Sequence, residues 1–259
     1  MQRIIALILL FLTSSGLTYS QEKRLSDENF IGWLVYNGTF KFHQKFSAHT
    51  EYQFRRVDGL ENGQQHLLRA GVNYIYKPSV IAHAGYGYIL TFPYGDYPTV
   101  LVGTLTPEHR IYEQVVLKNP VGRCEIIHRY RLEQRWIGKI TSQSKPDVES
   151  WIYLNRLRYS LRLNMPLVKK LNEKNSLYAV AADEIFIGFG KNLGSNIFDQ
   201  NRIGAFLGYK FNNNLKVETG FLSQIVQQGG RVNNSPVIQY NSGFQVAAFL
   251  DAGLLKKEK

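Results

Sequence analysis

Sulfur is scarce in this chain, and long apolar runs are absent beyond its first residues. Of 259 residues, one is cysteine and two are methionine. The lone Cys124 cannot form an intramolecular disulfide, and no cysteine–histidine cluster has the spacing of a zinc site. After residue 21 no stretch approaches the ~18 to 20 continuous apolar residues of a transmembrane helix. A membrane location of the mature chain therefore requires β-strands.

Aromatic residues and charge are plentiful instead. The chain has 16 Tyr, 15 Phe and 22 Gly, a composition that favours β structure over helix bundles. Its net charge of +11 indicates an anionic partner such as nucleic acid, phosphate groups or lipopolysaccharide. The length fits a single β-barrel.

The first 20 residues have the features of a secretory signal peptide. Arg3 precedes the apolar run Ile4 to Leu12, and Thr18-Tyr19-Ser20 offers small residues where a signal peptidase cleaves. We therefore expect residues 1–20 to be removed and residues 21–259 to form the β-barrel domain. Export makes nucleic acid an implausible partner.

From Phe30 onward the dominant period is two, the period of a β-strand. In "HRYRLEQRW", residues 128–136, charged side chains occupy every second position, and Tyr130, Leu132 and Trp136 lie between them. The same alternation predicts eleven strands, near 30–42, 46–57, 64–77, 80–92, 106–117, 122–136, 148–166, 175–190, 198–211, 215–228 and 237–252. Most are long enough for the ~9 to 11 residues of a membrane-spanning strand.

The connections between these strands alternate in length. Short turns are expected near residues 43–45, 77–79, 119–121 and 212–214, and longer polar stretches at 57–64, 92–106, 137–148, 191–197 and 228–236. Short turns at one rim and longer loops at the other are typical of an outer-membrane barrel. We therefore predict an all-β fold, a single antiparallel up-and-down transmembrane β-barrel of 10 to 12 strands.

An odd strand count conflicts with one part of this fold. Eleven strands would place the first strand's start at the looped rim, although both ends of a single-chain barrel are expected at the other. Either a strand is missing from the prediction, near Thr99 to Thr106 or upstream of Phe30, or one predicted strand lies outside the sheet.

The polar face of the strands carries the residues of greatest interest. Its mixture of Arg and Glu, with Lys gathered near turns, favours a polar interior over a solvated exterior, because arginine and carboxylate groups can pair across a lumen. The predicted interior charges are Glu51, Arg55, Glu108, Arg110, Arg129, Arg131, Glu133, Arg135, Arg156, Arg158, Arg162, Glu184, Arg202 and Glu218, with Arg69 on the same face. Aromatics toward strand ends are expected to form interfacial girdles: Trp33, Tyr52, Tyr74, Trp136, Trp151 and Phe211.

Several motifs, in order, resemble a family of predicted bacterial outer-membrane-type barrels, domain of unknown function 2490. They are "EYQFRR" from Glu51, "HLLRAGVNY" from His66, Gly85-Tyr86, "EHRIYEQ" from Glu108, "RYRLEQR" from Arg129, "RLRYSLR" from Arg156, Glu184, Asn201-Arg202, and Glu218 before Gly220-Phe221. The similarity covers roughly residues 30–252. It implies the bacterial outer membrane as location and a barrel as architecture, and no established reaction or ligand.

Three functions are compatible with these features. The first is an outer-membrane barrel that is structural or forms a narrow pore with a basic lumen, its partners being outer-membrane lipids, the barrel-assembly machinery and small anionic solutes. The second is a lipid-modifying enzyme using Ser47 and His49, although no Gly-x-Ser-x-Gly motif supports it. The third is a soluble periplasmic ligand-binding barrel. No cofactor, metal site or catalytic residue is predicted.

Overall fold

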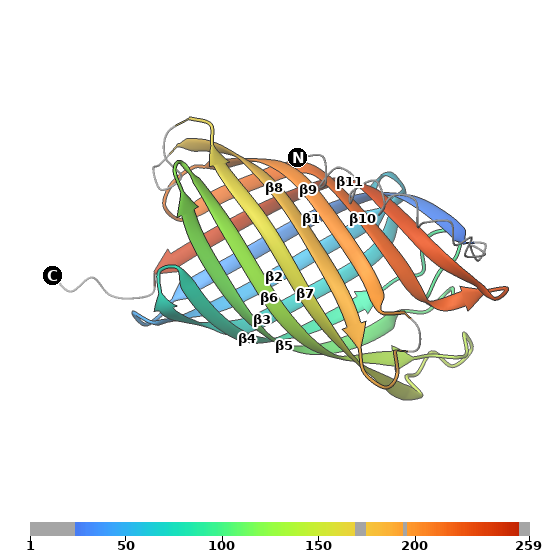
Figure 1. Ribbon diagram of the computed structural model, residues 1–259. Coiled ribbons are helices and arrows are strands. Elements are labelled where there is room, and N and C mark those ends of the chain that lie inside the picture. The colour runs from blue at the N-terminus through green and yellow to red at the C-terminus, as the bar shows by residue number, and fades with distance from the viewer. Residues whose placement is uncertain (1–23, 169–174, 194–195, 254–259) are drawn as a thin grey trace, which may run out of the picture.

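The computed structural model describes residues 24–168, 175–193 and 196–253, which form one closed β-barrel (Figure 1). The strands are β1 (Leu25–Lys41), β2 (Phe46–Val57), β3 (Asn62–Lys77), β4 (Val80–Thr91), β5 (Thr106–Val121), β6 (Cys124–Lys139), β7 (Ser150–Pro166), β8 (Ser176–Phe189), β9 (Phe198–Lys210), β10 (Leu215–Val232) and β11 (Ser235–Gly253). In this part of the chain the one helical turn is η1 (Asp58–Leu60), and no helix is long and apolar enough to cross a membrane. The predicted signal peptide lies outside the described residues.

The closed all-β barrel of 10 to 12 strands is confirmed, with eleven strands, but it is not antiparallel throughout. Each strand pairs antiparallel with the next along the chain, whereas β1 and β11 pair parallel from Leu25↔Val237 to Lys41↔Gly253. The reason is parity, because an odd number of strands joined by hairpins leaves the first and last strands pointing the same way. Among the described residues, neither 99–105 nor 24–29 adds a twelfth strand, because residues 25–29 extend β1.

The two rims differ, as predicted, with two exceptions. The turns after β1, β3, β5 and β9 are short, and the connections after β4, β6 and β8 at the opposite rim are longer. One exception is the predicted longer stretch 57–64, where residues 58–61 alone connect β2 to β3. The other is the predicted loop 228–236. There β10 and β11 continue to a two-residue turn at Asn233 and Asn234, whose φ angles of 48° and 63° fit the tight hairpin turns in which Asn is common.

Strand alternation separates an apolar exterior from a polar interior. Exposed side chains of β3, β5, β7 and β9 include Leu68, Val72, Ile111, Leu157 and Leu207, whereas their neighbours in sequence point inward and are largely buried. The exterior also has two acid–amide pairs. Gln134 donates to Glu113 at 3.3 Å, and Asn201 donates to Asp183 at 2.7 Å.

The prediction of exterior aromatic girdles is wrong for Trp33. Tyr52, Tyr74, Trp151 and Phe211 are exposed as predicted, but Trp33 is 2% exposed and lies in an interior apolar cluster. Both alternating sets of β1 are largely apolar here, with Ile31, Trp33 and Val35 on one face and Phe30 and Leu34 on the other. The pattern alone therefore does not decide which set faces the lumen.

Candidate functional site

The lumen contains the charged residues that the alternation selects. All fourteen predicted ladder residues, and Arg69, either line interior cavities or form ion pairs within the interior network. They come from β2 and β5 to β10, with Arg69 on β3. Residues from strands distant in sequence therefore converge on one enclosed space.

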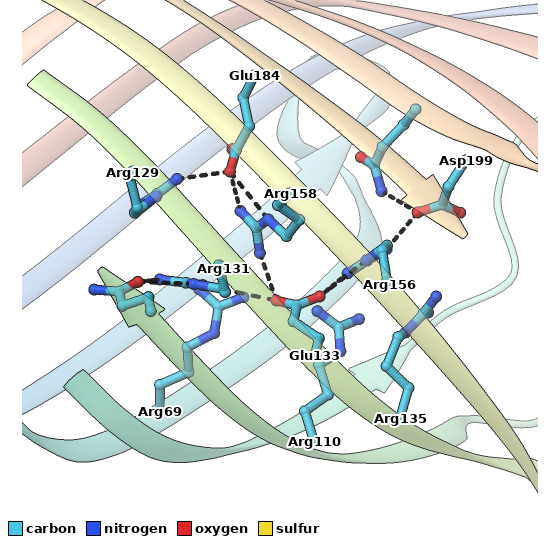
Figure 2. A network of polar contacts seen from close by, with 12 residues as sticks. Arg69, Arg110, Arg129, Arg131, Glu133, Arg135, Arg156, Arg158, Glu184 and Asp199 are labelled. Carbon is cyan, nitrogen blue, oxygen red and sulfur yellow. Dashed lines mark hydrogen bonds and ion pairs between the residues drawn. The ribbon is translucent and has the colours of Figure 1, made fainter. Parts of the chain in front are cut away.

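Glu133 of β6 is the centre of this network (Figure 2). Its side chain has no exposed surface, and its carboxylate accepts hydrogen bonds from Arg156 at 2.5 Å and from Arg158 at 2.7 Å. Both arginines belong to β7, where Arg156 is the register partner of Glu133. Arg131, on the same strand as Glu133, is farther away at 3.7 Å and instead donates twice to Gln114. The closest ion pairs of Glu133 are thus formed with arginines of the neighbouring strand.

Glu184 of β8 and Asp199, at the start of β9, extend the network around the wall. Glu184 accepts hydrogen bonds from Arg129 and Arg158, each at 2.7 Å, so that Arg158 joins Glu133 to Glu184. Asp199 accepts a hydrogen bond from Arg156. Figure 2 shows these side chains pointing from neighbouring strands toward one another.

Three further carboxylates are paired elsewhere in the lumen. Glu108 accepts hydrogen bonds from Arg110 at 2.5 Å and Arg135 at 2.6 Å, and Glu51 accepts one from Arg69 at 2.8 Å. Toward the short-turn rim, Glu218 accepts hydrogen bonds from Arg162 and from the Tyr178 hydroxyl. Every carboxylate of the predicted ladder therefore has an arginine partner.

Arginine nevertheless exceeds carboxylate in this network. Ten arginines, including Arg69, face six carboxylates, including Asp199, and eight of the arginines lie within 4.0 Å of a carboxylate. Among the described residues, Arg55 and Arg202 have no carboxylate within that distance. The network is therefore basic, and Arg55 and Arg202 account for two of its four excess positive charges.

Three cavities follow one another along the barrel. The loop-side cavity, of about 390 Å³, lies nearest the long loops; the middle cavity has about 360 Å³; and the turn-side cavity, of about 170 Å³, lies at the short-turn rim. Arg69, Arg158 and Arg202 line both the loop-side and the middle cavity, and Arg162 and Glu218 line both the middle and the turn-side cavity. Three arginines thus lie between the first two cavities, and the Arg162–Glu218 pair lies between the second and third.

The connection between β4 and β5, residues 92–105, covers the loop-side cavity. Asp96 N–H donates to the Asp27 carboxylate at 3.2 Å, the Tyr94 hydroxyl donates to Gln239 at 3.2 Å, and Gln228 donates to the Tyr97 carbonyl at 2.7 Å. These partners belong to β1, β11 and β10, which lie three to five strands away around the barrel from β4 and β5. The loop therefore crosses the mouth of the lumen.

The neutral hydroxyl of Tyr94 suits this contact. Burial raises the pKa of the Tyr94 hydroxyl, which keeps its proton available for Gln239. The wall that receives the loop is rich in buried amides, and Asn29, Asn241 and Gln224 form a hydrogen-bonded chain along it. The lumen thus has an amide-rich wall on β1, β10 and β11 and an arginine-rich wall on β5 to β8.

The proposed serine–histidine pair is not assembled as a catalytic unit. Ser47 is 2% exposed and accepts a hydrogen bond from Asn73 at 3.0 Å, whereas His49 lies 3.6 Å from Glu51. No hydrogen bond joins Ser47 to His49 in the described part of the chain, and both face the interior. Across residues 24–168, 175–193 and 196–253, no three metal-ligating side chains converge.

Sequence reasoning missed several residues of the lumen. Asp199 was not assigned because it lies where the β8–β9 register shifts, outside regular alternation. Asp27 lies upstream of the predicted first strand, yet it is 1% exposed and anchors the crossing loop. An acidic residue extending the alternation of Asn29 and Ile31 is the signal that identifies it.

The chain belongs to a family whose description assigns no function. The family model described as "Protein of unknown function (DUF2490)" matches residues 30–235, most of the barrel. The resemblance to this family is therefore confirmed. No curated protein and no solved structure matches the chain.

Proposed function

We propose that this protein is a bacterial outer-membrane barrel whose basic lumen admits small anionic solutes through a narrow passage. The membrane location is supported by the inverted arrangement of side chains. Buried Arg and Glu fill the interior, while exposed Leu, Ile, Val and aromatic residues cover the outside. A barrel dissolved in water would have the opposite arrangement, with its apolar side chains enclosed.

The observation that carries the anion preference is the boundary between the first two cavities. Its shared lining consists of three guanidinium groups, those of Arg69, Arg158 and Arg202. Rings of arginine or lysine favour anions in pores because they replace part of the hydration of a negative ion. The three cavities in series support a passage for solutes, and the excess of arginine over carboxylate supports a preference for anions.

Reconstitution in planar bilayers tests this proposal. In a KCl gradient we expect small conductance steps and a reversal potential displaced toward that of chloride. A folded protein that leaves the bilayer insulating, or a reversal potential displaced toward potassium, contradicts it. Recovery of the protein in the soluble periplasmic fraction, with none in outer membranes, contradicts the location.

A purely structural barrel is the alternative, and one observation favours it. The charge network is densely paired around Glu133, and residues 92–105 cross the mouth, so the interior also fits a filled and rigid core. This alternative predicts an insulating barrel whose lumen variants change stability without changing any transport. The bilayer measurement separates the two.

A further inference from the structure

Two arginines of the lumen share one indole ring, and neither has a carboxylate within 4.0 Å among the described residues. The guanidinium carbon of Arg55 lies 3.8 Å from the centroid of the Trp33 ring, and that of Arg202 lies 5.0 Å from it. Trp33 is held in place by its Nε1–H group, which donates to Gln64 at 2.7 Å. Two cations are therefore gathered at one fixed aromatic side chain.

Neutral groups satisfy the donors of these arginines but leave their charge unbalanced. Arg55 donates from Nε to Gln53 at 2.8 Å and from Nη1 to Gln65 at 2.7 Å, and Arg202 donates to Gln200 at 3.1 Å. Because both guanidinium groups are positive and contact the same ring, they repel each other. The cation–π contacts offset part of this repulsion. A bound anion would offset more, because it is attracted to both groups at once.

Both arginines line the loop-side cavity, where other guanidinium groups have partners. The described lining of this cavity includes seven guanidinium groups and two carboxylates, those of Glu108 and Asp199. Glu108 is paired with Arg110 and Arg135, and Asp199 with Arg156. No carboxylate of the cavity wall is thus left for Arg55 or Arg202. At about 390 Å³ the cavity lies in the size range of small-molecule sites.

We propose that the loop-side cavity binds a small solute through a carboxylate or phosphate group held between Arg55 and Arg202, beneath residues 92–105. The planar donor fork of arginine matches these oxyanions in a way that it does not match a spherical halide. The inference rests on the proposed function in that the solute reaches the cavity through the lumen. It adds the class of ligand and the residues that select it.

Binding to the full-length folded barrel in detergent tests this site without any need for conductance. Inorganic phosphate and succinate are titrated by calorimetry at constant ionic strength, with chloride as the balancing anion. We expect saturable binding of at least one of the two to the wild type, and comparison of their affinities distinguishes a phosphate site from a carboxylate site. Absence of binding by both overturns the proposal.

Variants then locate the site. Arg202→Gln and Arg55→Gln are each expected to weaken binding at least tenfold, and Arg202→Lys, which keeps the charge and loses the fork, at least threefold. The matched control is Arg129→Gln, which removes the same charge from the middle cavity but does not line the loop-side cavity. Its affinity should stay within twofold of the wild type. Equal weakening by Arg129→Gln would show a general effect of lumen charge and overturn the proposal.

Folding failure of one variant leaves the test intact. Arg55 is almost fully buried, whereas Arg202 is partly exposed, so Arg202→Gln and Arg202→Lys carry the result if Arg55→Gln does not fold. The outcome is also separable from the proposed function. A barrel that binds the oxyanion and insulates a bilayer contradicts transport alone, and a barrel that conducts chloride and binds neither probe contradicts this site alone.

Discussion

Arg158 donates hydrogen bonds both to Glu133 and to Glu184, each at 2.7 Å, and so connects the carboxylates of β6 and β8 through a single side chain of β7. Arg158 is 3% exposed. Its removal would leave two buried carboxylates with fewer partners, whereas most other arginines of the lumen serve one carboxylate. Arg158 is therefore expected to contribute more to stability than a lumen arginine that pairs with a single carboxylate.

We expect Arg158→Leu to destabilise the barrel by about 3–5 kcal/mol, the range for breaking a buried ion pair by removing one partner. Arg131→Leu should cost clearly less, because Glu133 keeps Arg156 and Arg158, and Arg131 is bound chiefly to Gln114. Urea unfolding in detergent micelles, with the heat resistance of the folded band on gels as a second readout, measures both. Equal destabilisation by the two variants would contradict the ranking.

This ranking shows where prediction from sequence ends. Period-two alternation placed Arg131 and Glu133 on one polar face, and spacing alone makes them natural partners. The shorter contacts of Glu133 are with Arg156 and Arg158, because register brings β7 alongside β6. Alternation within one strand carries no information about register between strands, so the composition of the lumen was predictable and its pairing was not.

The crossing loop illustrates a second limit. Residues 92–105 are recognisable as a long polar connection, but their path depends on Asp27, Gln228 and Gln239, which lie far away in sequence. By contrast, the alternation predicts all eleven strands, but a fully antiparallel barrel was expected from it, so the parallel pairing of β1 with β11 was not predicted. The number of strands was thus predictable from local pattern, while the parallel closure and the placement of the loop required the structure.

The contact between Asp27 and Asp96 leads to a prediction about access to the lumen. Asp27→Ala removes the acceptor that holds the backbone of residues 92–105, together with a hydrogen bond from Gln239. We expect the loop to leave the mouth more often and single-channel conductance to rise severalfold. Glu28→Ala is the matched control, because Glu28 is the exposed neighbour of Asp27 on β1 and carries the same charge. A similar rise in both variants would indicate an effect of charge at the rim.

Asp183 tests whether the exterior faces lipid. Its side chain is exposed on β8 between Ala181 and Ile185, and Asn201 donates to it at 2.7 Å. A carboxylate on a lipid-facing surface is unfavourable, so Asp183→Leu should stabilise the barrel in phospholipid vesicles by about 1–2 kcal/mol. Asn201 keeps a hydrogen bond to the Glu184 carbonyl at 3.3 Å.

Urea unfolding from vesicles measures the effect of Asp183→Leu. Glu61→Leu is the control, because Glu61 is exposed in the connection between β2 and β3 at the rim, and its replacement should be neutral. Loss of stability in Asp183→Leu, or an equal gain in the control, would contradict a lipid-facing position for this side chain.

Where β1 and β11 pair in parallel, one position requires glycine. Gly243 is the register partner of Ile31, and a Cβ atom at Gly243 would overlap the Ile31 carbonyl group. Since backbone atoms in a paired strand cannot move aside without disturbing the ladder, Gly243→Ala should destabilise the barrel by about 1–3 kcal/mol, as overpacking does in cores. Gly229→Ala is the control, because a Cβ there meets no atom within 4 Å. Both variants are compared by urea midpoint and by the fraction of heat-resistant folded barrel. An unchanged midpoint for Gly243→Ala would contradict the close approach of β1 and β11, and with it the parallel closure of an eleven-stranded barrel.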